Sequence, residues 1–219
     1  MQITNDIWQV GGAGYSSPED AAVYLLHCDG RAAIVDAGCG GHTERLSANI
    51  RKCGIAADQV DLLLLTHCHF DHTGGAAGLR DRFCCRIVAH ELDAAALEAG
   101  DSIRTAADWY GAVMNPLSVD VKLAGDRNRL QVGDRPVEVI HTPGHTPGSV
   151  VYMVDLDGER VLFGQDVHGP LHDNFASDAA AYRHSLGLLA DLNADILCEG
   201  HYGVLRGRET VREFIRSFL

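Results

Sequence analysis

One run of six residues constrains this chain more than any other stretch: His67-Cys68-His69-Phe70-Asp71-His72. It follows the mostly apolar residues 60–66 and precedes the glycine pair Gly74-Gly75. A buried strand that ends in a polar, glycine-rich loop presents the first loop residues at a sheet edge, where a ligand can reach them. Imidazole and carboxylate groups together suit zinc and neighbouring divalent metals. The run therefore predicts a metal site, the alternative being a polar loop of solvated histidines.

Further candidate ligands follow three other predicted strands. His145 lies between two Pro-Gly pairs after residues 137–141, Asp166 follows residues 160–163, and His201 follows residues 196–199. Each of these residues alone is more often an ordinary hydrogen-bonded loop residue. Together with the first run they form a set that can hold two divalent ions and leave positions open for water: His67, His69, Asp71, His72, His145, Asp166 and His201. Cys68 should point away from this set, because successive side chains of an extended segment alternate.

The charge balance limits the partners of this chain. Lys and Arg together number 18 against 30 Asp and Glu, which gives a net charge of −12. Nucleic acids and anionic membranes are bound through basic surfaces, so we expect neither as a partner and expect a small-molecule substrate instead. No apolar stretch approaches the ~20 residues of a membrane span.

The cysteines and the amino terminus favour a reducing compartment. There are 7 cysteines, an odd number, and no Cys-x-x-Cys pair occurs. Residues 1–6 carry neither the basic nor the apolar part of a secretory signal. We therefore expect free thiols and a cytoplasmic location.

The hydrophobic pattern predicts a single α/β domain over residues 1–219. Strands are expected at residues 3–10, 22–27, 32–36, 61–66, 86–89, 137–141, 149–154, 160–163 and 196–199, and helices at residues 43–53, 90–99, 179–191 and 209–218. The region 100–120 is a predicted insertion, partly helical over residues 101–116. Its Trp109, Tyr110 and Met114 have helical spacing, which favours either a core face or a substrate-facing flap. The same segment can also form a dimer contact.

These residues resemble the metallo-β-lactamase superfamily over nearly the whole chain. The resemblance rests on the run 67–72, on the three later candidates and on the early Val35-Asp36-Ala37-Gly38. It implies a four-layer αββα sandwich with the site at one edge of two packed sheets. It also implies a first metal on His67, His69 and His145, a second on Asp71, His72 and His201, and Asp166 as a bridge. Asp36 would support the ligands from behind, the alternative being a turn residue before Gly38.

The chain departs from the family pattern near the predicted bridge. Many relatives, glyoxalase II among them, have glycine directly before this aspartate, whereas here Gln165 follows Gly164. His168 and His172 add two histidines just beyond, which we expect at the surface. Tyr202 follows His201, and its hydroxyl can either stabilise an oxyanion or simply pack.

The sequence therefore predicts a metal-dependent hydrolase of the glyoxalase II-like branch. Two divalent ions, expected to be zinc with iron or manganese as alternatives, would activate water for attack on an ester, thioester or related carbonyl. Asp71 is the candidate that orients the water or carries a proton, and Tyr202 the candidate that stabilises an oxyanion. Two other interpretations stay open: a mononuclear non-haem iron enzyme resembling the persulfide dioxygenases, and a non-catalytic ligand-binding member of the fold. Among protein assemblies, the sequence leaves a homodimer open, with the region 100–120 as its contact.

Overall fold

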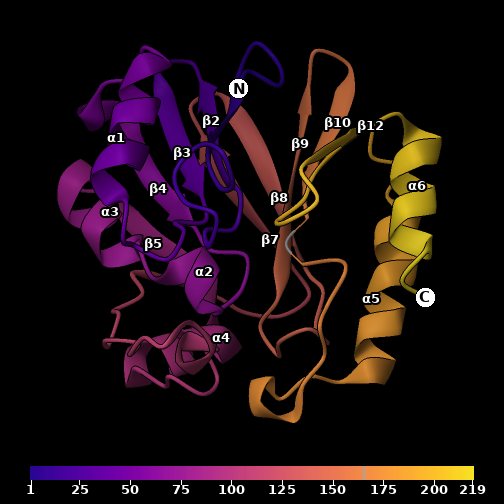
Figure 1. The fold of residues 1–219 in the computed structure, drawn as a ribbon. Helices are drawn as coiled ribbons and strands as arrows, with labels where there is room; N and C mark the ends of the chain where they lie inside the picture. Colours follow the sequence, from indigo (N-terminus) through magenta and orange to yellow (C-terminus); the bar gives the residue numbers. More distant parts are fainter. Residues whose placement is uncertain (165) are drawn as a thin grey trace.

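Two β-sheets lie face to face, and helices cover both outer surfaces (Figure 1). The computed structural model describes residues 1–164 and 166–219, so the departure at Gln165 lies outside the described residues. The layers follow the order helix, sheet, sheet, helix. This is the αββα sandwich that the family resemblance implied.

The first sheet is parallel over its second half. Its order is β1-β2-β3-β4-β5-β6, with parallel pairs from β3 to β6 and antiparallel pairs from β1 to β3. The hairpin between β2 and β3 turns at Asp29 and Gly30, whose φ values of 46° and 71° suit a tight turn between twisted strands. The strands are β1 (Ile7–Gly11), β2 (Val23–Cys28), β3 (Arg31–Val35), β4 (Val60–Leu64), β5 (Arg86–His90) and β6 (Val121–Leu123).

The second sheet is antiparallel except where β10 pairs with β11. Its order is β12-β11-β10-β9-β8-β7. The edge strand β7 alternates exposed and less exposed residues, and its exposed arginine side chains discourage pairing with other chains. The strands are β7 (Arg127–Val132), β8 (Arg135–His141), β9 (Val150–Leu156), β10 (Glu159–Phe163), β11 (Ile196–Cys198) and β12 (Val204–Arg206).

The helices divide between the two outer faces. Near the first sheet lie α1 (Thr43–Lys52), α2 (Phe70–Thr73), α3 (Ala76–Phe83) and α4 (Glu91–Ala99), and on the second lie α5 (Ala179–Asp191) and α6 (Arg208–Arg216) (Figure 1). Asp178 begins α5 by accepting hydrogen bonds from the N–H groups of Ala180 and Ala181. Gly100 ends α4 in the left-handed conformation, at φ 64°. No helix of the described chain is long and apolar enough to cross a membrane.

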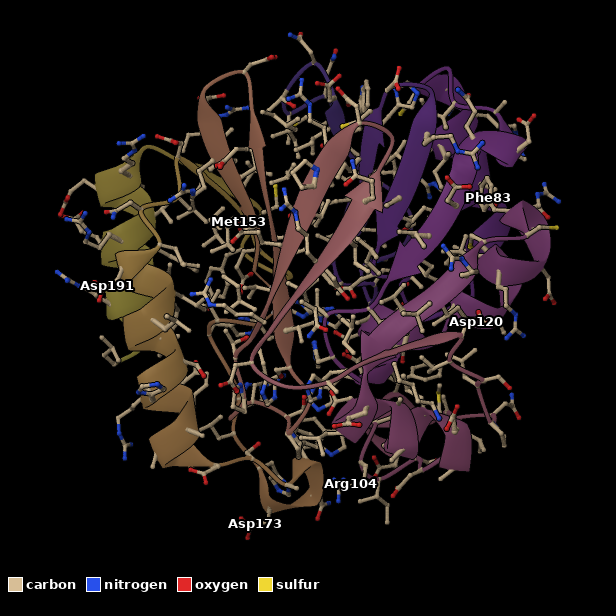
Figure 2. All side chains as sticks on the ribbon, turned by 180° about the vertical axis from the view of Figure 1, so that it is seen from behind. Phe83, Arg104, Asp120, Met153, Asp173 and Asp191 are labelled. Atoms are coloured by element: carbon tan, nitrogen blue, oxygen red, sulfur yellow. The ribbon has the colours of Figure 1, made fainter. Side chains whose placement is uncertain are left out.

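The core has three apolar layers, which follow from strand alternation. In β2, Val23 and Leu25 pack toward α1, whereas Tyr24 and Leu26 pack between the sheets. The third layer joins the second sheet to α5 and α6. Figure 2 shows side chains filling the space between these layers. Because both faces of each sheet are covered, the central strands consist mostly of apolar residues on both faces.

The structure corrects several predicted elements. The first strand begins at Ile7 rather than at residue 3, and residues 101–116 contain only the short 3₁₀-helix Ala107–Tyr110. The sequence pattern missed α2, which contains the last three residues of the metal-ligand run, and α3, which follows it. It also missed β6, β7 and β12. All seven cysteines are free, as expected.

Candidate metal centre

The candidate ligands meet at one end of the sandwich. The run 67–72 follows β4 in the first sheet, while His145, Asp166 and His201 follow β8, β10 and β11 in the second. Two groups of these side chains are close enough to hold ions: His67, His69, His145 and Asp166, and Asp71, His72 and His201. Cys68 instead lies in the apolar layer under the first sheet, as its alternation predicted.

The side chains of the first group are buried. His67, His69 and His145 are buried, and their rings meet at near-perpendicular angles. His145 Nε2 lies 3.0 Å from His69 Nδ1. Two imidazole nitrogens this close need a proton or a cation between them, since bare lone pairs repel.

The second group lies nearer the surface. His201 Nε2 is 3.2 Å from Asp71 Oδ2, and His72 Nε2 is 3.8 Å from the same oxygen. The side chains of His72 and Asp71 are buried, whereas that of His201 is 34% exposed. Ligands can therefore reach this group from the His201 side.

Asp166 lies between the two groups. Its Oδ2 is 3.5 Å from His145 Nε2 and 4.0 Å from His67 Nε2. Its Oδ1 is 3.1 Å from His72 Nε2 and 3.4 Å from His201 Nε2. The two oxygens of one carboxylate thus face different histidine groups, as a bridging ligand requires.

Hydrogen bonds fix which nitrogen of each ring faces the centre. His145 Nδ1 lies 2.9 Å from the carbonyl oxygen of Pro170, and His72 Nδ1 lies 2.8 Å from Asp36 Oδ2. Because these oxygens only accept, both Nδ1 atoms carry the proton. The Thr66 hydroxyl donates to Asp36, so it accepts from His67 Nδ1 at 3.1 Å. Each Nε2 therefore turns a bare lone pair toward the centre when the ring is neutral.

Asp36 holds this arrangement from behind. Its carboxylate accepts from the Thr66 N–H at 2.9 Å, from the Thr66 hydroxyl at 2.8 Å and from His72. Asp36 has a left-handed backbone, at φ 62°, which aspartate tolerates better than most residues. The supporting role is thus confirmed over that of a simple turn residue.

The donor set fits divalent metal ions. His67 Nε2, His72 Nε2 and Asp166 Oδ1 are buried and have no hydrogen-bond partner among the described residues. Buried polar atoms without partners are rare, and here all three point at the same centre. Four buried carboxylates surround it, and their charged partners in the described chain are all histidines: Asp36, Asp71, Asp166 and Glu199. Two divalent cations would balance these four negative charges.

In the metal-free site, the pKa values of the histidines shift in two opposite directions. Burial lowers the pKa of His67, His69 and His145. Burial opposes protonation of His72 and His201 as well, but neighbouring carboxylates outweigh it, raising the pKa of His72 and bringing that of His201 to about 10. Without metal, protons on these two rings partly replace the missing cations.

Asp93 joins the two sheets beneath the centre. From α4, its buried carboxylate accepts from the Cys68 N–H at 2.9 Å, the Thr146 hydroxyl at 2.6 Å and the Gly148 N–H at 2.7 Å. It therefore fixes the loop of the first ligand run against the loop that carries His145. No local sequence pattern indicates this role, because the bonded partners lie far apart along the chain.

Gly200 makes room for the centre. A Cβ atom at this position would lie 2.5 Å from Asp166 Oδ1 and 3.0 Å from His72 Cε1. The backbone before His201 therefore approaches the candidate ligands as closely as only glycine allows.

A pocket of about 140 Å³ opens onto the centre. The segment before β6 contributes Trp109 and Tyr110, and the loop after β10 contributes Pro170 and Phe175. Figure 2 shows these two loops, through their labelled Arg104 and Asp173, at the same end of the molecule. Met114 is buried in the core. Trp109 and Tyr110 therefore line the pocket, while the core interpretation holds for Met114; a substrate-facing flap stays a prediction.

Two tyrosines lie near the centre in different settings. Tyr110 interacts with Asp71, and burial together with the Asp71 charge raises the pKa of its hydroxyl. Tyr202 is 61% exposed, packs against Phe214 and Phe218, and is absent from the described pocket lining. Its catalytic role stays a prediction.

The two additional histidines differ. His168 lines the pocket and lies 2.9 Å from Glu199 Oε1, so the expectation of a surface residue is wrong for it. Its position two residues after Asp166 was the available signal. His172 is exposed, and its ring contacts Trp109 and Phe175 at the outer rim, as a surface position predicts.

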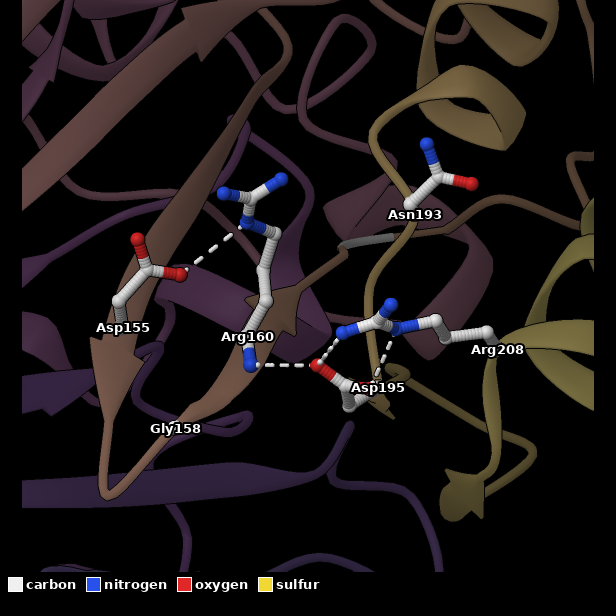
Figure 3. Close-up of a pocket in the computed structure, with 6 residues that line it drawn as sticks. All are labelled: Asp155, Gly158, Arg160, Asn193, Asp195 and Arg208. Atoms are coloured by element: carbon white, nitrogen blue, oxygen red, sulfur yellow. Dashed lines mark hydrogen bonds and ion pairs between the residues drawn. The ribbon is translucent and has the colours of Figure 1, made fainter.

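A larger groove of about 570 Å³ lies away from the centre, near the β9–β10 turn (Figure 3). Its two arginines are already paired. Arg160 binds Asp155, and Arg208 binds Asp195 (Figure 3). These ion pairs connect β10 with β9, and α6 with the loop before β11, so we assign them a structural role.

A family model described as the metallo-beta-lactamase superfamily matches residues 17–201. The chain therefore belongs to the metallo-β-lactamase superfamily, as the resemblance indicated. It is 30% identical to probable metallo-hydrolase MJ0888 of Methanocaldococcus jannaschii over 201 residues, which cover 89% of this chain and 92% of that protein.

Two further similarities concern activity and fold. A hydroxyacylglutathione hydrolase of Ruegeria pomeroyi is 31% identical over 189 residues, which cover 83% of this chain but only 62% of that enzyme. BJP-1, a subclass B3 metallo-beta-lactamase of Bradyrhizobium japonicum, superimposes with a TM-score of 0.80 at 22% identity, covering 100% of this chain and 89% of the other. The latter similarity establishes the fold alone.

Proposed function

We propose that this chain is a dinuclear metal-dependent hydrolase of thioesters or related esters. The observation that carries the proposal is Asp166, whose two oxygens face two separate groups of histidines. His67, His69 and His145 would hold the first ion, Asp71, His72 and His201 the second, and Asp166 both. Nitrogen and oxygen donors of this kind suit zinc.

The ions would supply Lewis acidity and lower the pKa of an attacking water from 15.7 toward ~7. Asp71 lines the pocket, so its carboxylate would orient that water, take its proton and pass the proton to the departing thiolate or alkoxide. Tyr110 stays protonated, because burial and Asp71 raise the pKa of its hydroxyl. That hydroxyl would turn from Asp71 to donate its hydrogen bond to the substrate. Tyr202 is the second candidate donor.

The pocket favours a small acyl group. Trp109, Pro170 and Phe175 form an apolar wall, and none of the described lining residues is lysine or arginine. Phosphate-rich groups would therefore have to remain outside the pocket. One relative is named a hydroxyacylglutathione hydrolase, and an acyl group on the glutathione sulfur is a thioester. These two points together support a thioester or ester with a compact acyl part.

Turnover by metal-loaded protein tests the proposal. We expect hydrolysis of acyl thioesters, and a loss of kcat of about 100-fold or more in Asp71→Asn. Tyr110→Phe and Tyr202→Phe, compared side by side, identify which hydroxyl contributes. Absence of turnover across thioesters, esters, lactones, phosphodiesters and β-lactams would contradict the proposal. Oxygen uptake with a persulfide by iron-loaded protein would favour the dioxygenase instead.

A further inference from the structure

His168 belongs to a third group of potential metal ligands. With Asp166 and His201 it offers ligand atoms that all lie within 4.8 Å of one another. Its ring lies 5.1 Å from that of His201, centroid to centroid. His168 also lines the pocket over the centre. It is therefore positioned beside the second ion site without belonging to either of the two main groups.

Glu199 holds the His168 ring in a defined orientation. Its side chain is fully buried, and Oε2 accepts from the N–H groups of His201 at 2.6 Å and Tyr202 at 2.8 Å. Oε1 lies 2.9 Å from His168 Nδ1. Because a carboxylate only accepts, Nδ1 carries the proton, and the neutral ring keeps a bare lone pair on Nε2.

The same construction appears on the other side of the centre. There the buried Asp36 accepts from His72 Nδ1 and leaves His72 Nε2 to face the carboxylates of the site. A carboxylate behind an imidazole is the usual support of a metal-binding histidine. A surface histidine needs no buried glutamate, which is costly to desolvate unless it is fully paired.

We propose that His168 is an additional ligand of the second ion, oriented by Glu199. The inference rests on the proposed dinuclear site and goes beyond its seven ligands. Five protein donors would then surround the second position: Asp71, His72, Asp166, His168 and His201. Zinc–nitrogen and zinc–oxygen distances are about 2.0–2.2 Å, so the ligand atoms around one ion would lie within about 4.4 Å of one another, close to the present spacing of this group.

Metal titration tests the inference without using catalysis. Apoprotein is titrated with Co²⁺ against a chromogenic chelator, in the wild type and in His168→Gln. We expect the second dissociation constant to rise by at least about tenfold, with the first unchanged. Glu199→Gln should shift it in the same direction by less. His184→Gln, on the exposed face of α5, is the matched control and should change neither constant.

Proton NMR of the Co²⁺ protein provides a second readout. A ligand histidine gives a strongly shifted, solvent-exchangeable ring N–H signal, and His168→Gln should lack one signal that His184→Gln retains. Unchanged constants and an unchanged set of signals would overturn the inference; a raised KM alone would then make His168 a substrate contact. Wild-type protein that binds one ion would contradict both this inference and the dinuclear site. Two bound ions without hydrolysis would contradict only the proposed activity.

Discussion

Replacing Asp36 by asparagine should prevent His72 Nε2 from binding a metal ion, although all seven proposed ligand residues stay in place. The Asp36 carboxylate accepts from Thr66 twice and from His72 Nδ1 at 2.8 Å. In Asp36→Asn the amide nitrogen turns toward His72 and donates a hydrogen bond. The His72 proton must then move to Nε2, which blocks the lone pair that would bind the second ion.

Two independent free-energy values give the expected loss of metal affinity. A hydrogen bond to a charged group contributes about 1.5–3 kcal/mol, and the wild-type tautomer loses one. Loss of a partner behind a ligand histidine weakens metal binding about 10- to 100-fold, which equals about 1.4–2.8 kcal/mol. Backbone strain adds little, because asparagine tolerates the left-handed φ of 62° at this position as well as aspartate does.

Zn²⁺ competition with a chromogenic chelator measures the change. The second dissociation constant should rise about 10- to 100-fold in Asp36→Asn, while the first stays within about threefold of wild type. Asp157→Asn is the matched control, since Asp157 also has a left-handed backbone, at φ 51°, but lies on an exposed turn. Wild-type affinity for both ions in Asp36→Asn would refute the reasoning.

Three further predictions concern the supports of the centre. Asp93→Asn turns an amide donor toward buried donors, so the free energy of unfolding should fall by about 2–3 kcal/mol in urea titrations of metal-free protein. Gly200→Ala should weaken the second ion at least about tenfold through the Cβ clash, whereas Gly187→Ala, whose Cβ meets nothing within 4 Å, should not. Metal binding at pH 7 should release about two to three protons, one each from His72 and His201 and up to one from metal-bound water, as calorimetry in two buffers measures.

Each of these has a contradicting outcome. Unchanged stability of Asp93→Asn would mean that the two ligand loops hold together without that carboxylate. Unchanged metal affinity in Gly200→Ala would mean that the backbone can withdraw from the site. The pKa of His201 is about 10 in metal-free protein, so its proton release should persist through neutral pH and disappear only as the pH rises through 10. Absence of proton release at pH 7 would contradict the charge balance described here.

The sequence predicted those parts of the fold that have strong local patterns. β4 is part of an apolar run, and α5 is a long helix with apolar residues at helical spacing. The β2–β3 turn has its own signal in Asp29-Gly30. β6 and β12 have three residues each, too short for any periodicity. β7 is a polar edge strand, paired on one side only, so it lacks the apolar run of a central strand.

The same distinction holds for the site. The candidate ligands cluster in sequence or follow strand ends, so their convergence could be predicted. The residues that hold them could not: Asp93 and Glu199 are ordinary acidic residues whose partners become neighbours only in the folded chain. Tyr110 ends the short 3₁₀-helix Ala107–Tyr110, and helical spacing alone did not show that its side chain reaches the centre.

Elemental analysis of protein purified without added metal tests the central claim most directly. With protein concentration fixed by amino-acid analysis, the account predicts two divalent ions per chain, with zinc as the expected metal. His67→Ala and His201→Ala should each retain about one ion, because they belong to different groups around Asp166. A single iron ion per wild-type chain, lost in His67→Ala and retained in His201→Ala, would contradict the dinuclear site.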